Sequence, residues 1–228
     1  MHVGVLDCDV RKDFPPEVGF QYFGDCVQAW LGDPTDDWTC AGHHCRLSQM
    51  PLPPLSFCRC LSFRDRESRA GAGTQFRVAE ASHLPNITEV GDFDGFVIPG
   101  SRYNATDDEP WIEPLCETIR AAHAQGKALF GICFGHQVIA KALGGVAGPA
   151  LPYNFTVDDI ELQPAAVHLL GGGNTIALYK SHGQQVLQAP PGAKVIARSI
   201  RTPVEMYTLD GNVFCCQGHP EFVSTHAG

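Results

Sequence analysis

A strand that passes directly into a helix in the second half of the chain constrains the fold most strongly. Residues 127–132 form an apolar strand pattern, and residues 134–143 form a helix pattern. Cys133 stands at the joint, between Gly131 and Gly135, and a sharp strand-to-helix turn needs glycines there because side chains would crowd it. Such a joint raises its central residue to the carboxyl edge of a sheet. The segment therefore predicts an α/β protein with Cys133 at that edge.

The alternation of strand and helix extends through most of the chain. A strand pattern at 3–6 is followed by a helix pattern at 17–31, and strand patterns at 76–78 and 93–98 are followed by a helix pattern at 110–126. After Gly145 the character changes to short strand patterns, at 155–162, 174–179, 193–199, 204–209 and 212–216. This order predicts an open, mostly parallel sheet with helices on both faces, followed by an antiparallel C-terminal part.

Composition narrows the range of partners and compartments. The 16 basic and 25 acidic residues give a formal net charge of −9, which is the wrong sign for a nucleic-acid or anionic-membrane binder. No apolar run reaches the roughly 20 residues of a membrane span, and the first residues lack the pattern of a signal peptide. We therefore expect a cytosolic protein whose ten cysteines are mostly free thiols.

Residues 38–75 do not fit the pattern of the rest of the chain. They show neither helical nor strand periodicity, and a structureless stretch of that length is unusual in a compact domain. We interpret them as an irregular insertion, or as a gene-model artefact such as translated intron. The alternative is a zinc knuckle, although the spacing of its ligands fits no common finger. Its candidate ligands are Cys40, His43, His44, Cys45, Cys58 and Cys60. We expect this stretch to bind no metal.

A second motif near the C-terminus supplies a partner for Cys133. An apolar strand pattern runs into His219-Pro220-Glu221. In an extended segment residues two apart face the same way, so His219 and Glu221 can point into one site. Glu221 would then orient the imidazole while His219 takes the proton of Cys133, whose place at a helix N-terminus favours a thiolate.

Together these motifs resemble the class I glutamine amidotransferases of the Cys-His-Glu triad type. The resemblance rests on residues 131–137, 219–221, 94–101 and 181–183, and it covers about 1–37 and 76–222. It implies a flavodoxin-like sheet in a single domain, residues 1–228, with Cys133, His219 and Glu221 as the catalytic residues. It further implies an oxyanion hole of backbone N–H groups at Gly100, Ser101 and Phe134, and substrate contacts from Gln137, Ser181 and His182. Gln137 could instead cap a neighbouring loop.

The resemblance is closest to stand-alone family members such as the cytosolic plant γ-glutamyl peptidases, on Tyr22 and residues 94–101, 107–112, 133–140 and 204–207. It implies hydrolysis of a γ-glutamyl amide bond in glutamine, glutathione or a conjugate, with no cofactor, metal, nucleic acid or membrane involved. Two alternatives stay open: a glutaminase subunit that passes ammonia to a synthase on another chain, and a non-catalytic relative. Family members carry a final helix after the triad, which we expect this chain, ending at Gly228, to lack.

Overall fold

The computed structural model describes residues 2–7, 37–40, 43–45, 75–80, 89–170 and 173–221. The helix predicted at 17–31 lies outside these residues, as do Cys58 and Cys60 of the zinc alternative. Within the described ranges, no helix has both the length and the apolar character needed to cross a membrane.

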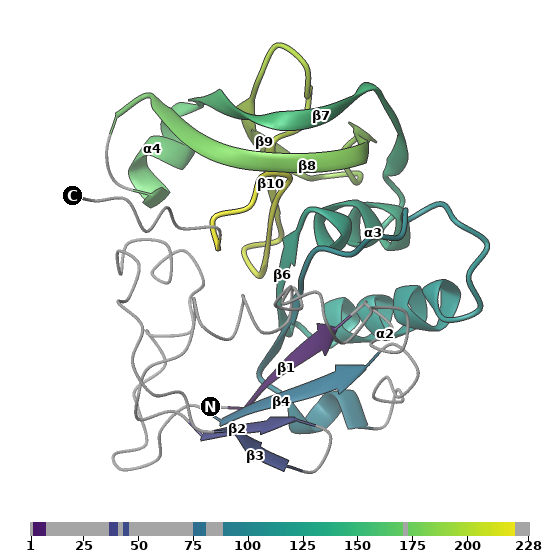
Figure 1. The fold of residues 1–228 in the computed structure, drawn as a ribbon. Coiled ribbons are helices and arrows are strands. Elements are labelled where there is room, and N and C mark those ends of the chain that lie inside the picture. The colour runs from purple at the N-terminus through teal and green to yellow at the C-terminus, as the bar shows by residue number, and fades with distance from the viewer. Residues whose placement is uncertain are drawn as a thin grey trace.

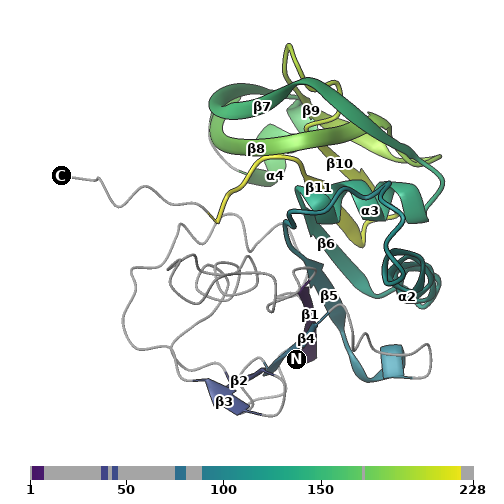
Figure 2. The ribbon, with the colours of Figure 1, turned by 45° about the vertical axis from the view of Figure 1, so that its right-hand side comes forward.

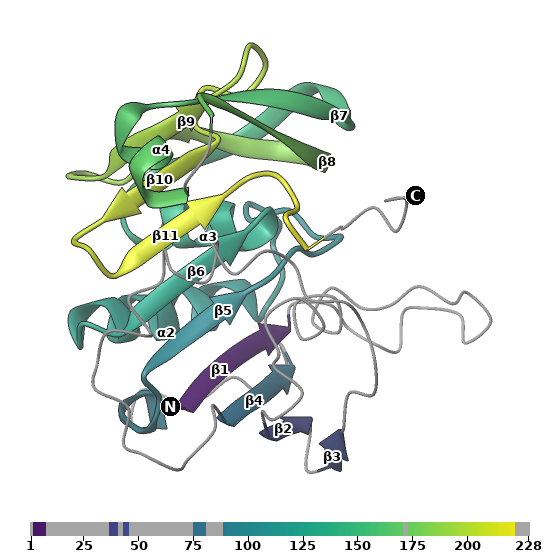
Figure 3. The same cartoon turned by 90° about the vertical axis from the view of Figure 1, so that its left-hand side faces the viewer.

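The centre of the fold is a parallel sheet, seen face-on in Figure 3. Its strands are β1 (His2–Asp7), β4 (Gln75–Glu80), β5 (Gly95–Ile98), β6 (Ala128–Ile132) and β11 (Val213–Cys216). They lie side by side in the order β4-β1-β5-β6-β11, and each neighbouring pair is parallel. Taken in chain order, this is the 2-1-3-4-5 arrangement of flavodoxin-like doubly wound sheets, so the predicted fold class is confirmed.

An antiparallel half continues the same sheet beyond β11. It contains β10 (Met206–Leu209), β9 (Lys194–Arg198), β7 (Val146–Leu162) and β8 (Thr175–Gln188), in that spatial order. Strands β7 and β8 form a long arched ribbon over the rest of the molecule (Figure 1). Both are much longer than the strands predicted at 155–162 and 174–179, because pairing with each other supplies backbone hydrogen bonds well beyond the residues whose side chains alternate.

Two short strands lie where the sequence pattern predicted neither strand nor helix. Strand β2 (Asp37–Cys40) pairs in parallel with β4, and β3 (His43–Cys45) pairs antiparallel with β2. The expectation of an irregular stretch therefore needs correction at its beginning. The strands form there because the open edge of β4 offers unpaired backbone groups to a neighbouring segment, and this pairing does not require an alternating sequence. Residues 46–74 lie outside the described part.

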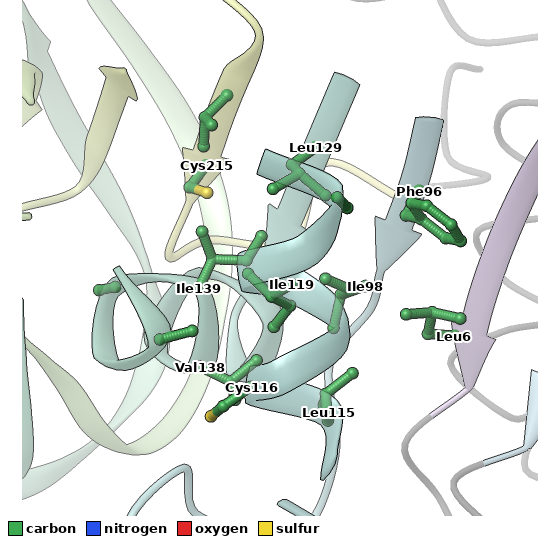
Figure 4. Packing of buried hydrophobic residues seen from close by; sticks show 14 of the residues in the cluster. Leu6, Phe96, Ile98, Leu115, Cys116, Ile119, Leu129, Val138, Ile139 and Cys215 are labelled. Atoms are coloured by element: carbon green, nitrogen blue, oxygen red, sulfur yellow. The ribbon is translucent and has the colours of Figure 1, made fainter. Parts of the chain in front are cut away.

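Helices α2 (Ile112–Ala124) and α3 (Phe134–Ala142) cover one face of the parallel strands (Figure 2). Alternate residues of each strand supply the two sides of the sheet. Phe96, Leu129 and Cys215 pack with α2 and α3 in one buried cluster, shown in Figure 4. The neighbouring residues of the same strands, such as Phe130 of β6, point to the other face and belong to a second buried cluster there. That cluster includes the short helix α4 (Pro164–Leu170), which the sequence pattern did not predict.

Candidate active site

Cys133 occupies a strained turn between β6 and α3. Its φ of 51° and ψ of −102° lie outside the regions that side chains usually allow, at a cost of about 1–3 kcal/mol. Both flanking glycines are required by close approach. A Cβ on Gly131 would lie 2.6 Å from the carbonyl of Gly135, and a Cβ on Gly135 would overlap the carbonyl of Ile98. The turn is tied to the end of β5 because the Gly135 N–H donates to the Pro99 oxygen at 3.1 Å.

The register of β6 and β11 brings the two sequence motifs together. Ile132, the last residue of β6, pairs with Cys216, the last residue of β11, in the parallel ladder. The Cys133 N–H donates to the Cys216 oxygen at 2.9 Å, and His219 follows three residues further on. Two segments far apart in the chain therefore leave the same edge of the sheet side by side.

His219 and Glu221 form a buried pair at this edge. The Nδ1 atom of His219 lies 2.7 Å from the Oε1 atom of Glu221, and neither side chain is exposed. Burial alone would lower the pKa of His219. The charges of Glu221 and Cys133 and hydrogen bonds to both outweigh burial and raise that pKa to about 10. The imidazole therefore keeps its proton through the neutral range, between a carboxylate and the nucleophile candidate.

Strand β8 closes the site from the antiparallel half. The His219 N–H donates to the Tyr179 oxygen at 2.8 Å, and the Cys133 Sγ atom lies 3.8 Å from the Ser181 oxygen. A Cβ on Gly218 would lie 2.8 Å from that of Leu178, so the chain before His219 runs close against β8. The same strand thus contacts both the thiol and the segment that carries the imidazole.

A pocket of about 430 Å³ opens in front of Cys133. Five residues predicted as oxyanion or substrate contacts line it: Ser101, Phe134, Gln137, Ser181 and His182. Gly100 is buried two residues after the end of β5 and is not among the lining residues. The roles of all these residues remain predictions, but the fold gathers them around one thiol.

The hydrogen bonds of Gln137 bear on its two predicted roles. Its amide nitrogen donates to the Gln184 oxygen at 2.7 Å and to Oε1 of Gln217 at 3.2 Å, so it joins the turn after Cys133 to β8 and to the segment before His219. The side chain nevertheless lines the pocket. Both the loop-holding and the substrate-contact roles are therefore compatible with its position.

His182 lines the pocket as a neutral imidazole. Burial lowers its pKa to about 4, against a raising effect of the hydrogen bond between Nδ1 and the Gln184 oxygen, which is 2.8 Å long. Since that carbonyl accepts from Nδ1–H, the Nε2 atom of His182 carries a lone pair. The side chain cannot supply a positive charge at neutral pH, and its Nε2 atom is buried with no hydrogen-bond partner among the described residues.

Sequence reasoning missed several pocket residues. Arg102, Tyr103 and Asn104 follow the predicted turn at Ser101, and Tyr153 comes from β7. No pattern marks these positions because they lie in a loop and on an exposed part of the ribbon. Gln184 could have been found, because it lies two residues after His182 on the inward face of a strand.

Three other cysteines differ from Cys133 in their surroundings. Cys116, Cys215 and Cys216 are buried free thiols, and burial raises the pKa of each, that of Cys215 to about 12. Cys133 alone among these four lines the pocket. No group of three or more His, Cys, Asp or Glu side chains placed to hold a metal ion occurs within the described residues.

Comparison with known proteins gives a consistent result. The sequence profile described as "Glutamine amidotransferase class-I" matches residues 67–228. The chain is similar to "Gamma-glutamyl peptidase 4" of Arabidopsis thaliana, with 37% identity over 153 residues, 64% of this chain and 61% of that protein. It therefore spans about three fifths of the length of that relative. It is also similar to one subunit of the glutamine-hydrolyzing GMP synthase of Saccharolobus solfataricus, with 29% identity over 64% of this chain and 76% of that one.

Solved structures give the same picture. A glutamine amido transferase from Methylobacillus flagellatus superposes with a TM-score of 0.61 and 32% identity, over 65% of this chain and 61% of that chain. A glutamine amidotransferase from Thermotoga maritima has a TM-score of 0.59 over 65% of each chain. At 16% identity this similarity supports the fold alone.

Proposed function

The chain belongs to the class I glutamine amidotransferases, and on that premise we propose that it hydrolyses a γ-glutamyl amide bond through a thioester on Cys133. One observation carries the proposal: Cys133 stands in a strained turn at the sheet edge where the buried His219–Glu221 pair also lies. A nucleophile, a base and an oriented carboxylate in this arrangement form the usual machinery of acyl transfer.

The first half of the reaction forms the thioester. The proton of the Cys133 thiol resides on His219, and Sγ attacks the γ-carbonyl carbon, so that a C–S bond forms and the carbonyl oxygen becomes an oxyanion. The backbone N–H of Phe134, at the start of α3, and that of Ser101 are the donors for this oxyanion. The C–N bond then breaks, and His219 gives its proton to the leaving nitrogen.

The second half releases glutamate. His219, now neutral, takes a proton from water as the water oxygen attacks the thioester carbon. The C–S bond breaks, glutamate leaves, and Cys133 and His219 return to their starting state. Glu221 accepts a hydrogen bond from the Nδ1–H of His219, with 2.7 Å between Nδ1 and Oε1, so that the other ring nitrogen faces the reaction.

The substrate class proposed is a free γ-glutamyl compound: glutamine, glutathione or a glutathione conjugate. Similarity to a plant γ-glutamyl peptidase supports this choice. A second candidate is favoured by the similarity to the archaeal GMP synthase component, namely a glutaminase subunit that delivers ammonia to a synthase on another chain. The two differ in whether activity needs a partner.

The test is to incubate the purified chain with glutamine, glutathione and an S-substituted glutathione, and to measure released glutamate, with Cys133→Ser as the control. Release from a γ-glutamyl peptide by the chain alone, and not by the control, supports the hydrolase. A well-folded chain that is inert on all three until a synthase is added would replace it by the partner-dependent glutaminase.

A further inference from the structure

A buried ion pair lies behind the pocket wall and takes no part in the reaction described above. Lys180 of β8 and Glu205, just before β10, form an ion pair in which neither side chain is exposed. The ammonium group also reaches Ser199 Oγ and Thr202 Oγ1 at 3.3 Å each and Asp158 Oδ2 at 3.3 Å. All three of its protons therefore have acceptors.

Stability alone is a poor reason for such a pair. Two charges removed from water each lose much of their hydration, and apolar residues of similar volume often replace a buried ion pair without loss of stability. Burial already raises the pKa of the Glu205 carboxyl, against the opposing effect of Lys180. What the pair does provide is a directional link between β8 and the segment before β10, which are not neighbours in the sheet.

Lys180 lies between two residues of β8 that contact the triad. Tyr179, the preceding residue, accepts the backbone hydrogen bond of His219 at 2.8 Å. Ser181, the following residue, presents the carbonyl that lies 3.8 Å from the sulfur of Cys133. If Lys180 moved, the backbone on both sides of it would move too, and the contacts of Tyr179 with His219 and of Ser181 with Cys133 would shift together.

Glu205 is connected to the triad through hydrogen bonds of Gln217. Its backbone oxygen accepts from the Gln217 N–H at 2.8 Å, two residues before His219. The Gln217 side chain in turn accepts from Gln137 at 3.2 Å. The ion pair therefore joins the segment that carries the imidazole to the strand that forms the wall of the pocket.

We propose that the Lys180–Glu205 ion pair is a positioning pair, which fixes β8 against the segment carrying His219 and so sets the placement of the imidazole and the pocket wall relative to Cys133. The inference rests on the proposed function, since it assigns these two residues a part in γ-glutamyl transfer without any contact to substrate. Misplacement of reacting groups by about 1 Å can cost roughly 100-fold in rate, so the link need move only slightly to matter.

The test replaces the pair by apolar residues of similar size, Lys180→Met with Glu205→Leu. The matched control is Arg120→Met with Glu113→Leu, which removes an exposed ion pair on α2, with 2.7 Å between its charged atoms, that is not among the pocket residues. For both variants and the wild type, kcat and KM for a γ-glutamyl substrate are measured well below the melting temperature. The rate of Cys133 alkylation by iodoacetamide is measured as a function of pH, because it reports the thiol and its imidazole without any substrate.

The expected result is a fall in kcat of about 10- to 100-fold and a displaced pH profile of alkylation for the buried pair, with neither change in the control. Wild-type kcat, KM and pH profile in the variant would overturn the proposal, whatever happens to the melting temperature. If the double variant does not fold, the fallback is Glu205→Gln, which keeps the shape of the side chain and leaves Asp158 as a counter-charge for Lys180. A fall in kcat with a displaced alkylation profile then supports the proposal, and wild-type values overturn it. A wild-type chain inert on every γ-glutamyl compound refutes the proposed function, while the alkylation profile still decides the positioning.

Discussion

His136 offers a sharp test of the electrostatics deduced for the turn that carries Cys133. It is the third residue of α3, its side chain is fully buried, and its Nε2 atom lies 3.0 Å from the Val204 oxygen. Burial lowers its pKa to about 3, with smaller lowering effects of His182 and Lys180 and a raising effect of the bond to Val204. The native protein therefore keeps this imidazole neutral in mild acid, while the unfolded chain does not.

The sign and size of the effect follow from that difference. Below the ordinary pKa of about 6.5 the unfolded state takes up a proton that the native state refuses, so stability is lost as the pH falls from about 6.5 towards about 3. At about pH 5 the loss from this one group is about 2 kcal/mol, since each pH unit below 6.5 is worth about 1.4 kcal/mol. His136→Gln keeps a donor for Val204 but cannot titrate.

The assay is denaturant unfolding of the wild type and of His136→Gln at about pH 7 and about pH 5, read as the change in free energy of unfolding between the two conditions. The wild type should lose about 2 kcal/mol more than the variant. Tyr207→Phe is the control, because it removes a hydroxyl that donates to the His136 oxygen at 3.2 Å without removing a histidine. It should lower stability equally at both pH values. Equal losses in the wild type and His136→Gln would refute the reasoning.

Three further predictions concern the turn and the triad. Cys133→Ser should abolish glutamate release at an unchanged melting temperature, and a glutamine-like chloroketone should label Cys133 and spare the other cysteines, as peptide mass spectrometry would show. His219→Ala should remove roughly 10⁴-fold or more of the activity, and Glu221→Ala less, because the carboxylate orients the base without transferring the proton; wild-type turnover in either contradicts the triad. Gly135→Ala should destabilise the fold by several kcal/mol in thermal unfolding, because its Cβ would overlap the Ile98 carbonyl, whereas Gly173→Ala, with open space around it, should not.

The parallel half of the fold was predictable because its signals are local. The apolar run at 128–132, the glycines on both sides of Cys133 and the helix that follows lie within one stretch of sequence, and the structure places β6 and α3 there. His219 and Glu221 do lie together as predicted, but the structure places Pro220 and Glu221 in a turn, so the argument from an extended segment does not describe the backbone that forms the pair. The spacing of residues in the sequence could not predict that β11 lies next to β6, because that depends on how all the strands pair in the sheet.

The antiparallel half was predicted less well. Strand β7 carries prolines and a run of exposed apolar side chains, among them Leu151 and Phe155, so its pattern does not resemble a half-buried strand. Lys180 and Glu205 were not singled out as a pair, because charged residues usually face water. Their burial follows from contacts between segments that are joined only after β7, β8 and β10 have assembled.

The strain at Cys133 is held by the parallel half of the sheet and not by the turn itself. The backbone around the turn bonds to the ends of two different strands, through Gly135 to Pro99 after β5 and through Cys133 to Cys216 in β11. Each of those strands also places side chains in the core that α3 covers. Since the unfavourable φ persists only while both strand ends are fixed, the reactive geometry depends on the packing of the parallel half. The segment carrying His219 leaves β11 of the parallel half and also bonds to Tyr179 of β8, so the placement of the proposed base depends on both halves of the sheet.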